Sequence, residues 1–129
     1  MAVRIIRLGS PRAAGEGLRI GTVRRPPRGV PKTDFAKRDY YDVWLPTLSP
    51  SEDLLVRGKA AAEDKAWKEF SRRYRAEMKS SDPSRLLDLL AALSRQTNFS
   101  VGCYCAEESR CHRSILRELL VERDAEIAG

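Results

Sequence analysis

The chain has 129 residues, of which 42% are hydrophobic and 33% charged, and its formal net charge at pH 7 is +6. This length suits one ordinary domain, and the apolar content is enough for a packed core, which excludes global disorder. The sequence contains neither an apolar run of about 18 residues nor the apolar stretch and cleavage site of a signal peptide, so we expect a cytoplasmic protein without a membrane partner.

The first third of the chain is predicted to hold two strands joined by loops. Residues 2–8 are apolar with two arginines and predict a β-strand. Residues 9–17 are rich in turn-forming residues and predict a loop. Residues 18–23 alternate between apolar and other residues, which predicts a second strand. Residues 24–32 contain three prolines and a glycine, which favour a stiff, irregular loop with four cationic side chains.

Positive charge is concentrated in this first third. Residues 1–40 hold 10 Lys and Arg against 3 Asp and Glu, whereas residues 41–129 hold 14 against 15. Such an excess indicates an anionic partner, either a phosphate-bearing small molecule or a nucleic-acid backbone, and a solvated basic surface is the alternative. Phe35 and Tyr40 are the aromatic residues of this segment, so base stacking on a nucleic acid would be limited.

Three helices are predicted between residue 49 and the strand at residues 99–105. Ser49 or Ser51 is expected to cap a short one. Residues 60–79 predict an amphipathic helix, and Asp82 as N-cap with Pro83 at the first helical position begins a mostly buried one. The expected inward residues are Ala66, Trp67, Phe70, Tyr74 and Met78 in the amphipathic helix, and Leu86, Leu87, Leu89, Leu90 and Leu93 in the buried one.

A strand, a turn and a helix end the pattern. Residues 99–105 are the clearest strand, and Ser109 is expected to cap the last helix, whose inward face is Ile115, Leu116, Leu119 and Leu120. The order of helix, strand, turn and helix over 83–124 is typical of an open α/β sheet. We therefore expect an α/β fold over residues 1–129, with a small, mostly parallel sheet flanked by helices and a long irregular N-terminal half.

The turn at residues 105–113 is the candidate site. In open α/β sheets, ligands bind beyond the carboxyl ends of the strands, and the first N–H groups of the next helix carry partial positive charge. We expect an anionic, phosphate-bearing ligand there and no cofactor. The expected anion-binding residues are Arg24, Arg28, Ser109, Arg110 and Arg113.

The same turn offers a nucleophile and a proton carrier. Cys111 lies at the predicted helix start near arginines, which should lower the pKa of its thiol. Cys105 ends the strand beside the turn, and the alternative for both Cys103 and Cys105 is a small buried hydrophobe. His112 is the only histidine, so it is the candidate acid or base. If the protein is an enzyme, Cys105 or Cys111 is the expected nucleophile.

Other chemistries remain open at this point. Three cysteines within nine residues suit a reducing compartment and allow a thiol redox module. Together with His112 they could bind zinc, but Cys111 and His112 are adjacent and should diverge on a helix, so no metal ligand is assigned. A nucleic-acid-associated basic protein is the other alternative. A standard cysteine phosphatase does not fit, because the sixth residue after Cys105 is Cys111 and not an arginine.

Four motifs resemble those of a known family. They are Arg24 with Pro27-Arg28-Gly29; Trp44-Leu45 followed by Ser49-Pro50-Ser51; Phe70 with Tyr74-Arg75-Ala76-Glu77; and Cys105 with Cys111-His112-Arg113. On these motifs, over roughly residues 3–121, the chain is similar to the bacterial and archaeal family called domain of unknown function 488, the YeaO-like group. The last motif is the pattern of its subgroup with a Cys-His-Arg triplet. The resemblance implies an α/β fold and brings no settled reaction.

One motif departs from the pattern of that family. Before Pro-Arg-Gly the family usually reads Asp-Arg-Leu-Trp, and those positions hold Val23, Arg24, Arg25 and Pro26 here. The acidic and tryptophan positions are lost. Any role of that aspartate in relatives is therefore not expected at this position.

Overall fold

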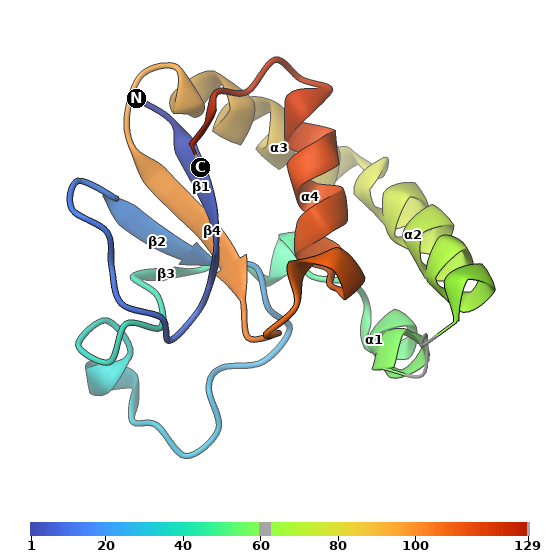
Figure 1. Cartoon of the computed structure of the whole chain (residues 1–129), viewed down its shortest axis with the longest axis horizontal. Helices are drawn as coiled ribbons and strands as arrows, with labels where there is room; N and C mark the ends of the chain where they lie inside the picture. Colours follow the sequence, from blue (N-terminus) through green and yellow to red (C-terminus); the bar gives the residue numbers. More distant parts are fainter. Residues whose placement is uncertain (60–62, 129) are drawn as a thin grey trace.

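A parallel sheet organises the residues that the computed structural model describes, which are 1–59 and 63–128. Its strands lie in the order β3-β2-β4-β1-β5, and every neighbouring pair is parallel (Figure 1). The strands are β1 (Val3–Arg7), β2 (Leu18–Gly21), β3 (Val43–Trp44), β4 (Phe99–Cys103) and β5 (Ile127–Ala128). The helices are α1 (Glu52–Lys59), α2 (Asp64–Met78), α3 (Ser81–Ser94) and α4 (His112–Val121), with 3-10 turns η1 (Lys32–Asp34), η2 (Pro46–Leu48) and η3 (Glu108–Arg110). The expected α/β fold is confirmed.

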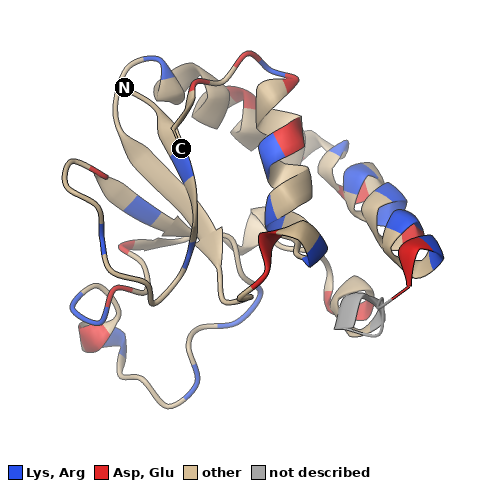
Figure 2. Cartoon of the chain, viewed as in Figure 1, with Lys and Arg blue, Asp and Glu red and all other residues tan. Residues whose placement is uncertain are grey.

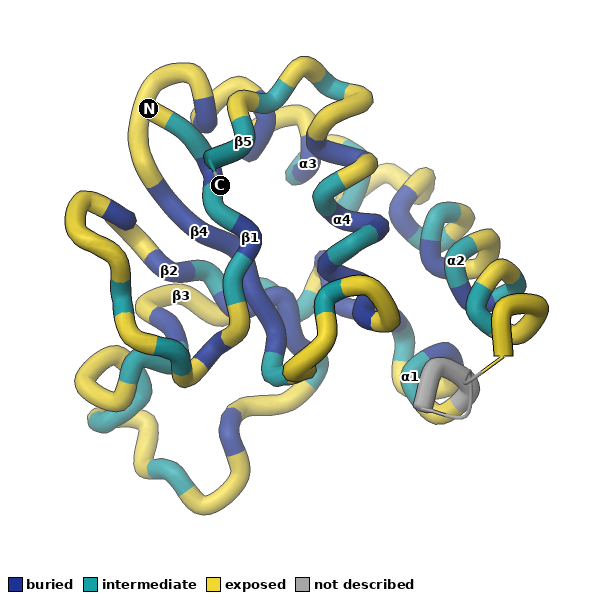
Figure 3. Tube along the Cα trace, viewed as in Figure 1, coloured by how far each residue is buried: buried dark blue, intermediate teal, exposed yellow. Residues whose placement is uncertain are grey.

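The centre of the sheet is the pair β1 and β4. All five residues of β4 are buried, as a central parallel strand requires, and this strand is dark blue in Figure 3. Gly102 lets the two strands approach, because a Cβ there would lie 2.5 Å from the carbonyl oxygen of Ile6. Helices α1 to α4 lie on one side of the sheet, and the loops after β1 and β2 lie on the other (Figure 1).

The apolar stripe of α2 packs on the sheet much as its spacing predicts. Phe70, Tyr74 and Met78 are buried, and Trp67 is half-buried against the same core. Ala66 is exposed, so its expected inward position is wrong. The predicted helix over 60–79 is observed from residue 64, and residues 60–62 lie outside the described residues.

Helix α3 is amphipathic and not mostly buried, which corrects the sequence-based expectation. Leu87 and Leu90 are buried in the core and Leu86 packs against it. Leu89 and Leu93 are exposed, because a run of five leucines around a helix must place some members on the face away from the sheet. The four inward residues expected on α4 are all buried.

Two helix starts also differ from the expectations. Helix α3 begins at Ser81, so Asp82 lies in its first turn and is not the N-cap. Helix α4 begins at His112, because Cys111 has extended backbone angles (φ −125°, ψ 151°) that separate it from the preceding 3-10 turn. Ser109 therefore does not cap α4. Ser51 does cap α1, since its Oγ accepts a hydrogen bond from the N–H of Leu54 at 3.3 Å.

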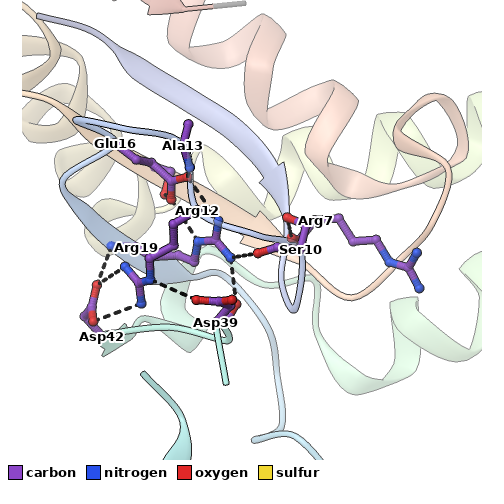
Figure 4. A network of polar contacts seen from close by, with 9 residues as sticks. Arg7, Ser10, Arg12, Ala13, Glu16, Arg19, Asp39 and Asp42 are labelled. Carbon is purple, nitrogen blue, oxygen red and sulfur yellow. Dashed lines mark hydrogen bonds and ion pairs between the residues drawn. The ribbon is translucent and has the colours of Figure 1, made fainter. Parts of the chain in front are cut away.

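A buried ion pair holds together the irregular N-terminal half (Figure 4). The Nε of Arg19 lies 2.8 Å from Glu16 Oε2, and neither side chain is exposed to any extent. The same guanidinium donates to the carbonyl oxygens of Ser10 and Asp39, at 2.7 and 2.6 Å. Glu16 also accepts a hydrogen bond of 2.8 Å from Ser100 on β4. The network therefore fastens two surface loops to the central strand.

Among the helices of the described residues, none combines the length and the apolar composition that a membrane span requires. This agrees with the absence of a long apolar run in the sequence. Helix α2 instead carries many charged residues, and the basic ones outnumber the acidic ones (Figure 2).

Candidate functional site

A cavity of about 600 Å³ lies where β4 ends. A volume of this size suits a small-molecule ligand. Three kinds of side chain line it: arginines from the loop after β2, cysteines and a histidine from β4 and α4, and apolar residues from α1. They include Arg24, Arg25 and Arg28; Cys103, Cys105 and His112; and Leu55 and Val56.

The basic loop after β2 is held in place by contacts at Arg24 and at Arg25. Arg24 donates hydrogen bonds of 3.2 Å to the carbonyl oxygens of Ser49 and Pro50, immediately before α1. The hydroxyl of Tyr104 donates to the carbonyl oxygen of Arg25 at 2.9 Å. The loop is therefore attached to α1 on one side and to the end of β4 on the other, although its backbone forms no regular element.

Helix α2 holds in place the segment of chain just before α1, which lies beside the cavity. The Tyr74 hydroxyl donates to the carbonyl oxygen of Leu48 at 2.7 Å. The carboxylate of Glu77 accepts hydrogen bonds from the N–H and the hydroxyl of Ser51, at 2.9 and 2.6 Å. Three segments that are far apart in the sequence, those of Arg24, Ser51 and Glu77, thus meet beside the cavity. Tyr74 and Glu77 support the cavity without lining it.

The three arginines that line the cavity differ in whether other residues already engage their guanidinium groups. Arg24 is engaged by backbone carbonyls, and Arg25 forms an ion pair with Glu52. Arg28 is exposed, lines the cavity, and makes no hydrogen bond or ion pair with any residue in the described part of the chain. Arg28 is therefore the cation best placed to bind an anion in the cavity.

The three cysteines form one sulfur cluster with an exposed and a buried part. The sulfur atoms of Cys103 and Cys111 lie 2.7 Å apart, and both residues are buried beside Leu8, Val23 and Tyr41. Cys105 is exposed and lines the cavity two residues beyond Cys103. A ligand in the cavity would therefore meet the Cys105 sulfur, and Cys111 would lie behind it.

Charge in the cluster is concentrated on Cys105. Hydrogen bonding from Cys103 and then Cys111 outweighs partial burial and, together with the positive charge of Arg113, holds the pKa of the Cys105 thiol well below its usual value. The Cys103 thiol donates hydrogen bonds to Cys105 and Cys111 and is buried, and these effects together raise its pKa. This arrangement favours a thiolate at Cys105.

Cys111 does not have the lowered pKa that its position at a helix start predicts. A hydrogen bond from Cys103 lowers the pKa of Cys111, but its own hydrogen bond to Cys105 and its burial outweigh this and raise the pKa overall. The expectation considered the helix dipole and the arginines, and it missed the exposed neighbouring thiol that competes for the negative charge.

The hydrogen bonds of His112 fix its tautomer. Its Nε2 lies 2.8 Å from the carbonyl oxygen of Thr22, which can only accept, so Nε2 carries the proton. The Nδ1 lone pair is then directed to the Cys111 sulfur, 3.7 Å away. Burial lowers the pKa of His112 to about 4, so the imidazole is neutral at pH 7 and its Nδ1 is unprotonated.

The other predicted site residues do not line the cavity. The buried Arg113 donates from NH2 to the carbonyl oxygen of Cys105 at 2.7 Å, and its Nε has no partner among the described residues. Arg110 pairs with Asp64 at 2.5 Å and extends towards α2. The hydroxyl of Ser109 bonds to the neighbouring Glu107. Arg24, Arg28, Cys105 and His112 do meet at the cavity, as their predicted roles require.

Within the described residues, one group of potential metal ligands comes together. Ligand atoms of Cys103, Cys111 and His112 lie within 4.8 Å of one another. Two thiolates on one zinc ion lie roughly 3.8 Å apart, given tetrahedral geometry and a Zn–S distance of about 2.3 Å. The sulfur atoms here are 2.7 Å apart, so this arrangement does not match a zinc site.

Sequence reasoning missed four residues of the site. Cys103 lines the cavity although it is buried. Thr22 orients the histidine, and Leu55 and Val56 give α1 an apolar wall. The alternation of Cys103 and Cys105 along one strand face was a signal for the first, because side chains two residues apart point the same way. Nothing local marks the other residues.

The model of the family DUF488-N3a, described as the active DUF488-N3 subclade, matches residues 3–124. No curated protein and no solved structure matches the chain. The matched range includes all of the sheet except β5, together with every helix and every residue that lines the cavity.

Proposed function

The chain belongs to the DUF488 family, and from this membership and the cavity geometry we propose that it is an enzyme that binds an anionic, phosphate-bearing small molecule and attacks it with the Cys105 thiolate. The observation that carries the proposal is that Cys105, His112 and Arg28 line one cavity. The description of the matching subclade as active supports catalysis over binding alone.

Anion binding is assigned to Arg28, with Arg24 as a second, less available cation. An arginine that faces a cavity and has spare donors can form two parallel hydrogen bonds to a phosphate or carboxylate group. The apolar side chains Leu55 and Val56 on the opposite wall suit the uncharged body of the same ligand. The ligand would then be fixed at both ends beside the Cys105 sulfur.

Nucleophilic attack is assigned to Cys105 because it is the exposed thiol and carries the negative charge of the cluster. Arg113 holds the backbone carbonyl of Cys105 and places a positive charge nearby, which makes it a positioning residue. The neutral His112 is available as a base within the same cluster. The three free cysteines also support the proposal that the protein works in the reducing cytoplasm.

The test compares two alkylating reagents of similar size, of which one is negatively charged and the other is neutral. Iodoacetate is an anion and iodoacetamide is neutral, so their rate ratio at Cys105 reports whether the cavity attracts anions. We expect Arg28→Ala to lower this ratio by about fivefold to tenfold, which corresponds to the loss of one charge-assisted hydrogen bond. Inorganic phosphate should slow iodoacetate labelling of the unmodified protein.

Arg85→Ala is the matched control, because Arg85 is an exposed arginine on α3 away from the cavity. It removes the same net charge and should leave the ratio unchanged. An equal drop in both variants would mean that only overall charge matters, and an unchanged ratio in Arg28→Ala would refute the anion site.

A further inference from the structure

We propose that the three cysteines form a thiol–disulfide relay, in which Cys105 exchanges with an anionic disulfide and passes the oxidation to the buried pair of Cys103 and Cys111. This activity goes beyond the proposed function, in which Cys105 reacts in the cavity and neither buried thiol undergoes a reaction. The substrate class is the disulfide of a small thiol that carries carboxylates. The products are two molecules of that thiol and a Cys103–Cys111 disulfide.

The geometry of the buried pair carries this inference. Cys103 ends β4 and Cys111 immediately precedes α4, so the two residues belong to different elements. Their sulfur atoms are nevertheless 2.7 Å apart, and a disulfide bond of about 2.05 Å needs only a small further approach. Both side chains are almost completely buried, so a dissolved disulfide cannot reach them as easily as it reaches the exposed Cys105.

His112 supplies the base that such a relay needs. Its Nδ1 faces the Cys111 sulfur at 3.7 Å, and its Nε2 is held by the carbonyl of Thr22. Cys111 must lose its proton before it can attack, because the thiolate is the nucleophile in disulfide exchange. A neutral imidazole beside that sulfur is placed to accept the proton.

The relay has three balanced steps. First, the Cys105 thiolate attacks one sulfur of the disulfide RSSR, which gives a Cys105–SR mixed disulfide and releases RS⁻. Second, Cys111 passes its proton to His112 Nδ1 and attacks the Cys105 sulfur, which releases the second RS⁻ and forms a Cys105–Cys111 bond. Third, Cys103 loses its proton to one released RS⁻ and attacks the Cys111 sulfur, which forms the Cys103–Cys111 disulfide and restores the Cys105 thiolate. The other RS⁻ takes the proton from His112 Nδ1, which gives the second thiol molecule and returns the imidazole to its neutral form.

The chemistry of the cavity selects the oxidant. A hydroperoxide would need neither a volume of about 600 Å³ nor a free guanidinium. A disulfide that carries carboxylates would use both, because Arg28 can bind one carboxylate while the sulfur atoms lie beside Cys105. Glutathione disulfide is a suitable probe of this class.

The experiment maps disulfides in the whole protein. The reduced protein is mixed with glutathione disulfide without oxygen, stopped with acid at intervals, alkylated and digested with trypsin. Cleavage after Arg110 separates Cys111 from the peptide that holds Cys103 and Cys105, so a new disulfide joins two peptides, and fragmentation assigns the bond. We expect glutathione on Cys105 first, followed by a Cys103–Cys111 bond with Cys105 free.

Variants assign each step. Cys105→Ser should slow formation of the buried bond by about tenfold or more, because only buried thiols remain. Cys111→Ser should leave glutathione on Cys105. His112→Gln keeps a donor for the Thr22 carbonyl but removes Nδ1, so the mixed disulfide should accumulate before it resolves. Arg28→Ala should slow the first step with glutathione disulfide but not with neutral hydroxyethyl disulfide, and Arg85→Ala should slow neither.

Two results would overturn the relay. One is glutathione that stays on Cys105 of the unmodified protein while Cys103 and Cys111 remain reduced. The other is a buried bond that forms as fast in Cys105→Ser as in the unmodified protein. The first of these leaves the proposed function intact, because Cys105 still reacts. The unmodified protein gives this answer even if a variant fails to fold.

Discussion

His112 stays neutral because it is buried against the end of the sheet and receives no compensating carboxylate. Tyr74 packs edge-on against its ring, with centroids 5.6 Å apart, and the Thr22 carbonyl oxygen accepts a hydrogen bond from its Nε2. The positive form therefore loses its hydration without gaining a strong partner, and its pKa falls to about 4. The same residue thus links the base proposed for the site to the stability of the fold.

This link predicts how stability depends on pH. The unfolded chain has a His pKa of about 6.5, so between roughly pH 6.5 and 4 the unfolded state binds a proton that the folded state does not. The stabilisation is complete above that window and is lost as pH falls through it, by about 3 kcal/mol in total. Denaturation of the unmodified protein and of His112→Gln across this range should show the loss only in the former. Equal slopes would contradict a buried neutral histidine.

The buried Arg19–Glu16 pair gives a second prediction. Removing one partner of a buried pair leaves an uncompensated charge, so we expect Arg19→Met to cost about 3–5 kcal/mol in chemical denaturation. The more exposed pair of Arg12 and Asp42 serves as the comparison, and Arg12→Met should cost about 1 kcal/mol or less. Similar costs for the two variants would show that burial does not distinguish the pairs.

Single residues of the site were predictable where one local pattern decides their position. Cys105, His112 and Arg28 follow from a strand end, a helix start and a proline-rich loop, and all three line the cavity. Arg113 and Arg110 have the same local pattern, but the first turns inward to a carbonyl and the second pairs with Asp64 on α2. Long-range partners decide these directions, and the sequence pattern does not contain them.

Helix α2 shows how an apolar stripe becomes part of the core. Phe70 stacks between Trp67 and Tyr74, with ring centroids 5.1 and 6.4 Å away. We expect Phe70→Ala to cost about 3–5 kcal/mol, because it removes a buried ring and leaves a cavity. Chemical denaturation measures the cost. Leu89→Ala on the exposed face of α3 should cost below about 1 kcal/mol, and a comparable loss in both would contradict the assigned faces.

At the scale of elements, periodicity predicted which helices and strands exist better than where they begin. The strand at 99–105 and the inward face of α4 were predicted because their apolar patterns are continuous. The start of α4 was not, because Cys111 has extended backbone angles and packs its sulfur against Cys103 of β4, and the local sequence pattern contains neither feature. The exposed leucines of α3 show the same limit, since composition does not identify the covered face.

Across the whole molecule, part of the positive charge of the first forty residues is used internally. Arg12, Arg19 and Arg25 form ion pairs with acidic side chains. The remaining cations lie mostly along the open loop that follows β2, which Figure 2 shows as separated blue segments rather than one continuous face. The molecule therefore presents a local cationic wall at the cavity more than an extended basic surface.

This distribution predicts weak binding to nucleic acid. A protein that follows a phosphate backbone needs several free cations along one face, and its affinity falls steeply with salt. We expect random duplex DNA to bind without saturation at about 0.15 M salt, measured by fluorescence anisotropy. Saturable binding under these conditions would instead favour the nucleic-acid alternative that the composition allowed.

The most direct test of the site is the order in which the three cysteines are alkylated in the native protein at neutral pH. We predict that pulse labelling with iodoacetamide, read by mass spectrometry, modifies Cys105 about tenfold or more faster than Cys103 or Cys111, because Cys105 alone among them combines exposure with a lowered pKa. Added phosphate should slow the labelling of Cys105. Equal, slow labelling of all three thiols, or faster labelling of Cys111, would contradict a Cys105 thiolate in the cavity.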